Sequence, residues 1–353
     1  MKTLFRWAAL IGLLCTWSLS SDLAANEQAS VVRGSWRSRT IEVDGLQDGE
    51  KAPVVSTVKL HPNGRLLASA GDDHLVRIWD LREGTVIHKL TGHTDWVRAL
   101  AFSPDGNLLV SGGNDRHIRV WNSATGEKLD VDVVHPRAIS GLSFNAAGDE
   151  LVVIGFEKTA RVYSTTEWKL LREIGCPCQD MRALKLSPDG KIFASGGRNG
   201  IVRWWTTEMD TVLLNQAAHR QRVRSVAFSD DNKWFASAGE DGRVVLRSIH
   251  DPQATTTLPR VTAKIFAIVF IDKNLLATAG SDDLIRIWDI NTRQEVTRLD
   301  GHLGTIVAMD YQNGVLVSGS YDTTIRVWDQ RDATALETEL GPRIGNAESG
   351  IVK

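Results

Sequence analysis

The 353-residue sequence is poor in several residue types, and each shortage excludes a class of protein. Only three cysteines are present, which is too few for a small domain held together by disulfides. The 41 Lys and Arg side chains nearly balance the 43 Asp and Glu side chains, which leaves a net charge of −2. This charge favours neither a nucleic-acid partner nor a membrane surface. A hydrophobic fraction of 42% is ordinary for a globular protein.

Long apolar runs are equally scarce, and the one that exists lies near the N-terminus. Two cationic residues precede an apolar-rich segment over residues 7–19, which small and polar residues follow. This order is typical of a secretory signal, and the run is shorter than the roughly 20 residues that cross a bilayer. We therefore expect residues 1–25 to be a signal peptide, cleaved after Ser20 or Ala25. An uncleaved membrane anchor is the alternative.

Two cysteines, Cys176 and Cys178, would remain after cleavage. They could pair in an oxidising compartment, but the Cys-Pro-Cys spacing closes a very small and strained ring. They are too few for a metal site without His or acidic ligands close by. We expect free or paired surface cysteines on a loop, with a redox role as the alternative. Cys15 does not fit a lipoprotein site, because the large Leu14 precedes it.

What the sequence does contain is a repeat with a period near 40 residues. Seven short aromatic–polar pairs, or their equivalents, follow one another at spacings of 42, 42, 42, 42, 41 and 40 residues. They are Trp79-Asp80, Trp121-Asn122, Tyr163-Ser164, Trp205-Thr206, Arg247-Ser248, Trp288-Asp289 and Trp328-Asp329. A fixed period of this length predicts a repeat architecture. Residues that recur in every copy then belong to the scaffold, and residues that differ are the candidates for function.

One copy, over residues 93–132, shows the local structure that we expect. Its apolar and polar residues alternate in short segments separated by turn residues. Ser103-Pro104-Asp105-Gly106 reads as a turn in which Gly106 takes the left-handed conformation. The four expected antiparallel strands cover residues 97–103, 108–112, 118–121 and, more weakly, 127–131.

A single four-stranded sheet cannot bury both of its faces, which constrains how the copies assemble. Seven sheets packed face to face around an axis bury these faces, and closing the ring protects the sheet edges. An open solenoid is the alternative, but it needs polar terminal copies, and none is evident.

Several strings in the repeats resemble the WD40 family. They are Ser111-Gly112-Gly113-Asn114-Asp115 and Gly319-Ser320-Tyr321-Asp322, each followed by a tryptophan, and the pairs Gly92-His93 and Gly301-His302. The resemblance implies an all-β fold, a seven-bladed β-propeller of four-stranded antiparallel blades over residues 26–340, with a flexible tail over 341–353. It also implies that a terminal strand completes the last blade. Residues 36–43 are preferred for this place over the competing segment 334–340.

The resemblance further implies a buried polar network of His, Ser or Thr, Asp and Trp in each blade. Two copies carry the full set: His93, Ser111, Asp115 and Trp121, and His302, Ser318, Asp322 and Trp328. Other copies carry incomplete sets: His219, Ser237, Asp241 and Arg247 in blade five, Ser195, Asn199 and Trp205 in blade four, and His135 and Glu157 in blade three. Ser, His and Asp together can form a catalytic triad. Their recurrence in several blades indicates instead a scaffold that satisfies buried polar groups.

Residues that differ between copies are expected to form a ring on the top face of the propeller, and we expect a partner to bind there. The ring residues are Trp96, Arg98, Phe156, Arg182, Arg198, Arg222, Arg224, Phe266 and Tyr321, with Asn114, Glu240 and Lys264 among them. The four arginines of blades four and five are expected to form a basic sector, with the aromatic residues elsewhere on the ring. Arginine and aromatic residues are enriched at binding hot spots.

These patterns predict a non-enzymatic scaffold for protein–protein or protein–peptide interaction in an exported compartment, periplasmic in a bacterium and secreted otherwise. The expected partner is a protein or peptide, and the basic sector favours an acidic one. We expect a monomeric propeller with no cofactor, metal, nucleic acid or membrane span after cleavage. One alternative is a propeller enzyme of hydrolase or lyase type with a site in the central channel. The other is an anionic-ligand binder that uses the arginine sector.

Overall fold

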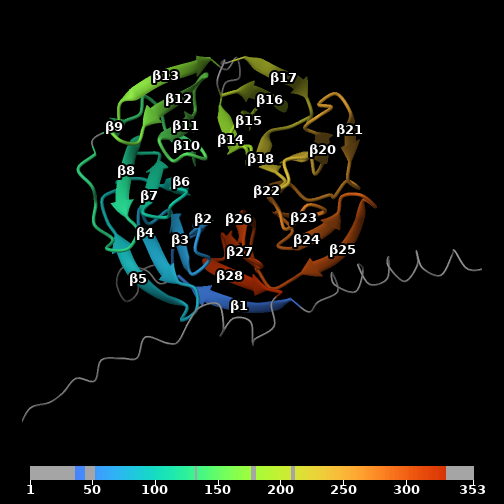
Figure 1. The fold of residues 1–353 in the computed structure, drawn as a ribbon. Coiled ribbons are helices and arrows are strands. Elements are labelled where there is room, and N and C mark those ends of the chain that lie inside the picture. Colours follow the sequence, from blue (N-terminus) through green and yellow to red (C-terminus); the bar gives the residue numbers. More distant parts are fainter. Residues whose placement is uncertain (1–35, 44–51, 132, 176–179, 208–210, 331–353) are drawn as a thin grey trace, which may run out of the picture. The chain divides into compact units, whose positions relative to one another are not determined.

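Seven four-stranded antiparallel sheets are arranged in a ring, so the chain from Trp36 onward is an all-β seven-bladed propeller (Figure 1). The computed structural model describes residues 36–43, 52–131, 133–175, 180–207 and 211–330. The predictions for the signal peptide, the three cysteines, the segment 334–340 and the tail 341–353 lie outside these residues. Within the described ranges, no helix has the length and hydropathy that a membrane crossing needs.

Each blade begins at the centre of the ring and continues outward (Figure 1). The inner strands are β2 (Val55–Leu60), β6 (Val97–Phe102), β10 (Ile139–Phe144), β14 (Met181–Leu186), β18 (Val223–Phe228), β22 (Ile265–Phe270) and β26 (Ile306–Gln312). The second strands are β3 (Leu66–Gly71), β7 (Leu108–Gly113), β11 (Glu150–Gly155), β15 (Ile192–Gly197), β19 (Trp234–Gly239), β23 (Leu275–Gly280) and β27 (Val315–Ser320).

The third and outer strands complete the blades. The third strands are β4 (Val76–Asp80), β8 (His117–Asn122), β12 (Thr159–Ser164), β16 (Ile201–Thr206), β20 (Val244–Ser248), β24 (Ile285–Asp289) and β28 (Thr324–Asp329). The outer strands are β5 (Thr85–Leu90), β9 (Val133–Val134), β13 (Leu170–Gly175), β17 (Val212–Ala217), β21 (Thr255–Thr257), β25 (Gln294–Leu299) and β1 (Arg37–Glu42).

The ring is closed by the N-terminal strand. β1 pairs antiparallel with β28, with Ile41 opposite Ile325, and so forms the outer edge of the seventh blade. Ile41 and Val43 are buried in one apolar cluster with residues of blades seven and one. This strand therefore joins the N-terminal part of the propeller to its last blade.

The second blade departs from the sequence prediction in its outer strand. The prediction of a strand over residues 127–131 holds only in part: Glu127 O accepts from Asn122 N–H and Leu129 N–H donates to Val120 O, but the outer strand β9 lies at Val133–Val134 and pairs with His117 and Ile118. Only Lys128 within the predicted range makes a bridge, to Trp121. The preceding turn agrees with the prediction, since Gly106 has a φ of 77° and its N–H donates to the Ser103 carbonyl.

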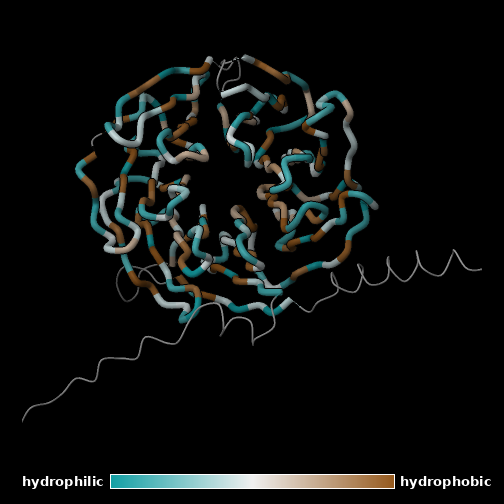
Figure 2. Tube along the Cα trace, in the orientation of Figure 1, coloured by the Kyte–Doolittle hydropathy of each residue, from teal (hydrophilic) through white to brown (hydrophobic). Residues whose placement is uncertain are grey.

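The hydrophobic core lies between neighbouring blades and not within one of them. One cluster joins Val76 and Ile78 of the first blade to Val97 and Leu100 of the second, and Trp121 packs into it. Figure 2 shows hydrophobic and hydrophilic segments interspersed along the trace of every blade. Because blades one to five each contribute to two such clusters, these blades depend on both neighbours for burial.

Candidate functional site: the stacked-arginine face

Every inner strand carries a β-bulge near its first residue. In each blade the pairing of the inner strand with the second strand skips one residue. The skipped residues are Ser56, Arg98, Ser140, Arg182, Arg224, Phe266 and Val307. A bulged residue is released from the ladder and its side chain is re-aimed. Three of the seven released residues are arginines.

Each of these three arginines lies over an aromatic ring. The guanidinium carbon of Arg182 is 3.9 Å from the centre of the Phe156 ring. Arg98 lies 5.1 Å from the centre of a Trp96 ring, and Arg224 lies 5.1 Å from the centre of the Phe266 ring. All six side chains are half-buried. We call these six residues the stacked-arginine face: Trp96, Arg98, Phe156, Arg182, Arg224 and Phe266.

Polar neighbours orient the same guanidinium groups. Arg98 Nε donates to Asn114 Oδ1 at 2.6 Å, and Arg182 Nε lies 2.5 Å from Asp180 Oδ1. Arg224 Nη2 lies 2.6 Å from Glu240 Oε1. Stacking from one side and a carboxylate or amide on another hold each guanidinium group in a fixed position.

The three arginines influence one another electrostatically. Burial lowers the pKa of Arg98, and the charges of Arg182 and Arg224 lower it further, against the opposing effects of Tyr321 and Asp95. Burial also lowers the pKa of Arg224, where Glu240 opposes the shift and Arg182 adds to it. The guanidinium groups stay charged at neutral pH. A bound anion would relieve the repulsion among the three arginines.

The sequence predicted a basic sector of arginines with the aromatic residues elsewhere on the ring, and the structure groups these residues differently. Arg222 and Arg224 both contact Glu240, at 3.4 and 2.6 Å, so part of the expected basic sector is neutralised. The aromatic residues do not lie apart from the arginines, because three of them stack against arginines. Arg198 is exposed and Tyr321 is 47% exposed, and neither belongs to the three arginine–ring stacks of this face. The signal that the sequence contained was an arginine at the bulge position of three copies.

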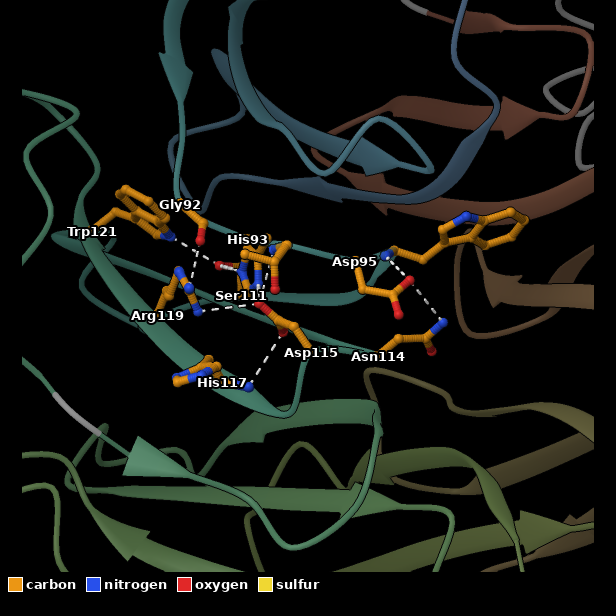
Figure 3. Close-up of polar contacts among 11 residues, drawn as sticks. Gly92, His93, Asp95, Ser111, Asn114, Asp115, His117, Arg119 and Trp121 are labelled. Carbon is orange, nitrogen blue, oxygen red and sulfur yellow. Dashed lines mark hydrogen bonds and ion pairs between the residues drawn. The ribbon is translucent and has the colours of Figure 1, made fainter.

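The His, Ser, Asp and Trp residues of the second blade form the buried network that the resemblance implied (Figure 3). His93 Nδ1 lies 2.8 Å from Asp115 Oδ2, and His93 Nε2 lies 2.7 Å from Ser111 Oγ. Trp121 Nε1 donates to the same Ser111 oxygen at 2.9 Å. The network fastens the loop after β7 to the second and third strands, and it is repeated in the seventh blade.

In the seventh blade the distances are nearly the same. His302 contacts Asp322 and Ser318 at 2.8 Å each, and Trp328 Nε1 donates to Ser318 Oγ at 2.9 Å. Burial would raise the pKa of Asp322, but hydrogen bonds from His302, Thr324 and the backbone outweigh it and hold the pKa well below its ordinary value. The aspartate is thus a charged, fully bonded structural group.

The incomplete copies show where the network fails. In blade four the Ser195 hydroxyl and the Trp205 indole N–H have no hydrogen-bond partner among the described residues, so the set expected there does not assemble. Blade three, expected to depart most, still brings His135 Nε2 within 3.1 Å of Glu157 Oε1. In blade five, Arg247 is buried and its Nη1 donates to the Pro252 carbonyl at 2.9 Å.

A comparison with protein families agrees with this geometry. The family model described as WD domain, G-beta repeat matches residues 45–80, 84–122, 168–206, 211–247 and 293–329, which together exceed half of the chain. The chain belongs to the WD40 family. The two blades without a match of their own, the third and the sixth, are full four-stranded sheets of the same WD40 propeller.

Curated proteins with similar WD40 segments come from several organisms. The mouse periodic tryptophan protein 2 homolog is 41% identical over 160 residues, which cover 43% of this chain and 17% of that protein. Cell division control protein 4 of Saccharomyces cerevisiae is 40% identical over 79 residues, 22% of this chain and 10% of that protein. A U3 snoRNP-associated protein-like protein of Arabidopsis thaliana is 38% identical over 72 residues, 20% of this chain and 15% of that protein. The chain therefore matches less than a fifth of the length of each of these relatives.

One recurring arginine of the repeat was not predicted as part of the scaffold. An arginine stands two positions before the aromatic residue in six copies: Arg77, Arg119, Arg161, Arg203, Arg286 and Arg326. Several of them bind the loop carboxylate of their blade, at 2.6 Å for Arg77 with Asp73 and 2.7 Å for Arg286 with Asp282.

Across the described part of the chain, no three His, Cys, Asp or Glu side chains gather as a metal site.

Proposed function

We propose that this WD40 propeller is a non-enzymatic platform that binds an acidic segment of a protein or peptide on the stacked-arginine face. The observation that carries the proposal is the set of three bulge arginines, each stacked on an aromatic ring. An arginine held in this way presents donors to a carboxylate, while the ring beside it offers apolar contact. Membership of the WD40 family supports the proposal, since the variable faces of repeat folds serve as binding surfaces.

Acidic rather than neutral partners fit the charge of the face. Only Arg182 and Arg224 have a carboxylate partner among the contacts given above, and Arg98 is bonded to the neutral amide of Asn114. An incoming carboxylate therefore meets one guanidinium without a paired acid and two that share theirs. A partly buried ion pair of this kind is screened less by salt than a pair at a fully exposed site.

The test compares the folded protein with three variants on an array of acidic and neutral synthetic peptides. We expect acidic peptides to be retained by the native protein and lost by the triple variant R98A/R182A/R224A. Replacement by lysine at the three positions keeps the charge but not the planar stack, so intermediate retention is expected. The matched control, R37A/R293A/R298A, removes three exposed arginines from other parts of the chain and should retain the peptides. Equal retention by both alanine variants would contradict the proposal.

We further propose that the platform works in an exported compartment. The support is the order of cationic, apolar and small residues over residues 1–25. Sequencing the N-terminus of the mature protein from its host should then give Ser21 or Asn26 as the first residue. A mature chain that still begins at Met1 in the cytosolic fraction would contradict this part of the proposal.

A further inference from the structure

Two adjoining cavities lie at the other end of the inner strands from the stacked-arginine face. They are lined by the last residues of the inner strands and by the turns that follow, whereas the arginine bulges are near the first residues. The larger cavity has a volume of about 540 Å³ and the smaller one about 250 Å³. Lys59, Lys185 and Gln312 line both of them. The larger volume falls within the roughly 300–1,000 Å³ that is common for small-molecule sites.

The seven blades differ in the residue that they place at this level of the inner strand. Counting three residues from each bulge gives Lys59, Ala101, Ser143, Lys185, Ala227, Val269 and Asp310. Four of the seven are uncharged, so the repeat itself does not require charge here. The two lysines and the aspartate are therefore particular to their own blades.

The two lysines are in different electrostatic situations. Lys59 Nζ lies 2.6 Å from Asp310 Oδ1, while Asp310 Oδ2 accepts the backbone N–H of Leu60 at 2.8 Å. Both carboxylate oxygens of Asp310, on blade seven, are thereby bonded to residues of blade one. Among the residues that the structure describes, Lys185 forms no ion pair with a carboxylate.

Lys185 is therefore an ammonium group without a matched anion. Repulsion by Lys59, with burial as the second cause, lowers its pKa to about 8, and Asp310 and Asp230 oppose the shift. Asp230 is exposed, where water and salt screen its charge. These four side chains are the charged groups among the residues that line the two cavities.

One part of the wall of the larger cavity is apolar. Leu100, Leu142 and Leu184 from three consecutive blades line the larger cavity, together with Phe102 and Phe144. Leu142 and Leu184 are half-buried and present part of their surface to the cavity. Apolar surface of this kind favours a ligand with a hydrocarbon body, because burying it removes apolar area from water.

We propose that this cavity binds a small monocarboxylate, with its carboxylate on Lys185 and its apolar body against Leu100, Leu142 and Leu184. A single negative charge suits the site, because one ammonium is unmatched and two aspartates are already present. An apolar body suits the leucine part of the wall, while Ser143, Ser187 and Gln312 line other parts of the cavity. The proposal is independent of the stacked-arginine face and adds a ligand of a different class at the opposite end of the inner strands.

The test uses octanoate as the probe and its uncharged analogue octanamide as the comparison, with the full chain in a titration calorimeter. We expect octanoate to bind the native protein at least about tenfold more tightly than octanamide, since a charge-assisted hydrogen bond is lost with the amide. Inorganic phosphate alone should bind far more weakly than octanoate. Equal binding of octanoate and octanamide, or of phosphate and octanoate, would overturn the proposal without any variant being made.

Two variants locate the site. Lys185→Met should weaken octanoate binding about tenfold or more, whereas Lys89→Met, which removes an exposed lysine of β5, should leave it unchanged. Binding to the native protein should also fall between about pH 7 and pH 10, as the Lys185 ammonium loses its proton. An affinity that is the same in Lys185→Met and Lys89→Met, or that does not change across this pH range, would contradict the assignment.

Discussion

At the scale of single residues, the hydroxyl of Ser111 is the centre of the network in the second blade. It bonds His93 Nε2 at 2.7 Å and accepts from Trp121 Nε1 at 2.9 Å, and it is fully buried. Ser111→Ala leaves two buried polar groups without this partner, so we expect a loss of about 1–3 kcal/mol in the free energy of unfolding. Urea denaturation measures it. Ser38→Ala, at an exposed position of β1, is the control and should change stability little.

The same networks predict that acid destabilises the propeller in two stages. Burial lowers the pKa of His93 in the folded state. For Asp241, burial would raise the pKa, but hydrogen bonds from His219 and the backbone outweigh burial and lower the pKa to about 2. Both groups bind protons more weakly when folded than when unfolded, so their contribution is present at high pH and is lost on acidification.

The melting temperature should therefore decrease first below about pH 6.5, as unfolded histidine takes up a proton, and again below about pH 4, as unfolded aspartate does. A series of thermal melts from neutral pH to pH 3 checks both stages. Asp241→Asn should reduce the second stage. A melting temperature that stays constant or rises on acidification would contradict the sign of the effect.

At the scale of elements, β1 is the strand on which closure depends. Ile41 is 4% exposed and packs with blades seven and one, whereas its neighbour Thr40 is exposed on the same strand. Ile41→Ala should cost about 2–5 kcal/mol of unfolding free energy through the lost burial and the cavity that remains. Thr40→Ala is the matched control, and equal effects of the two changes would argue that β1 is not part of the closed core.

Seven copies of the repeat were enough to predict seven blades, because a repeat that cannot bury its own faces must stack on its neighbours. The outer strand of the second blade was predicted over residues 127–131 but lies at Val133–Val134. Outer strands are difficult to place from sequence, because they are polar and pair on one edge only. The six residues of the stacked-arginine face were all among those predicted for the ring, but the stacking of each arginine on an aromatic ring was not. Arg182 meets Phe156 of the preceding blade, a contact set by how two blades approach each other and not by the repeat.

At the scale of the whole molecule, the propeller presents different chemistry at the two ends of its inner strands. The bulge end carries three stacked arginines, and the other end carries Lys185 in a cavity whose wall is partly apolar. Both features occupy positions at which the seven copies disagree, while the buried networks occupy positions that recur, in full or in part, from blade to blade. The scaffold therefore sets the geometry, and the departures from the repeat provide the binding groups.

Amide hydrogen exchange in the presence of an acidic peptide that the native protein retains tests the central claim most directly. The account predicts slower exchange at the stacked-arginine face, over residues 95–99, 180–183 and 222–225, and the same slowing should be absent from R98A/R182A/R224A. The outer strands should exchange as in the free protein. Protection confined to the outer strands, or equal protection in the triple variant, would contradict the claim that this face binds the partner.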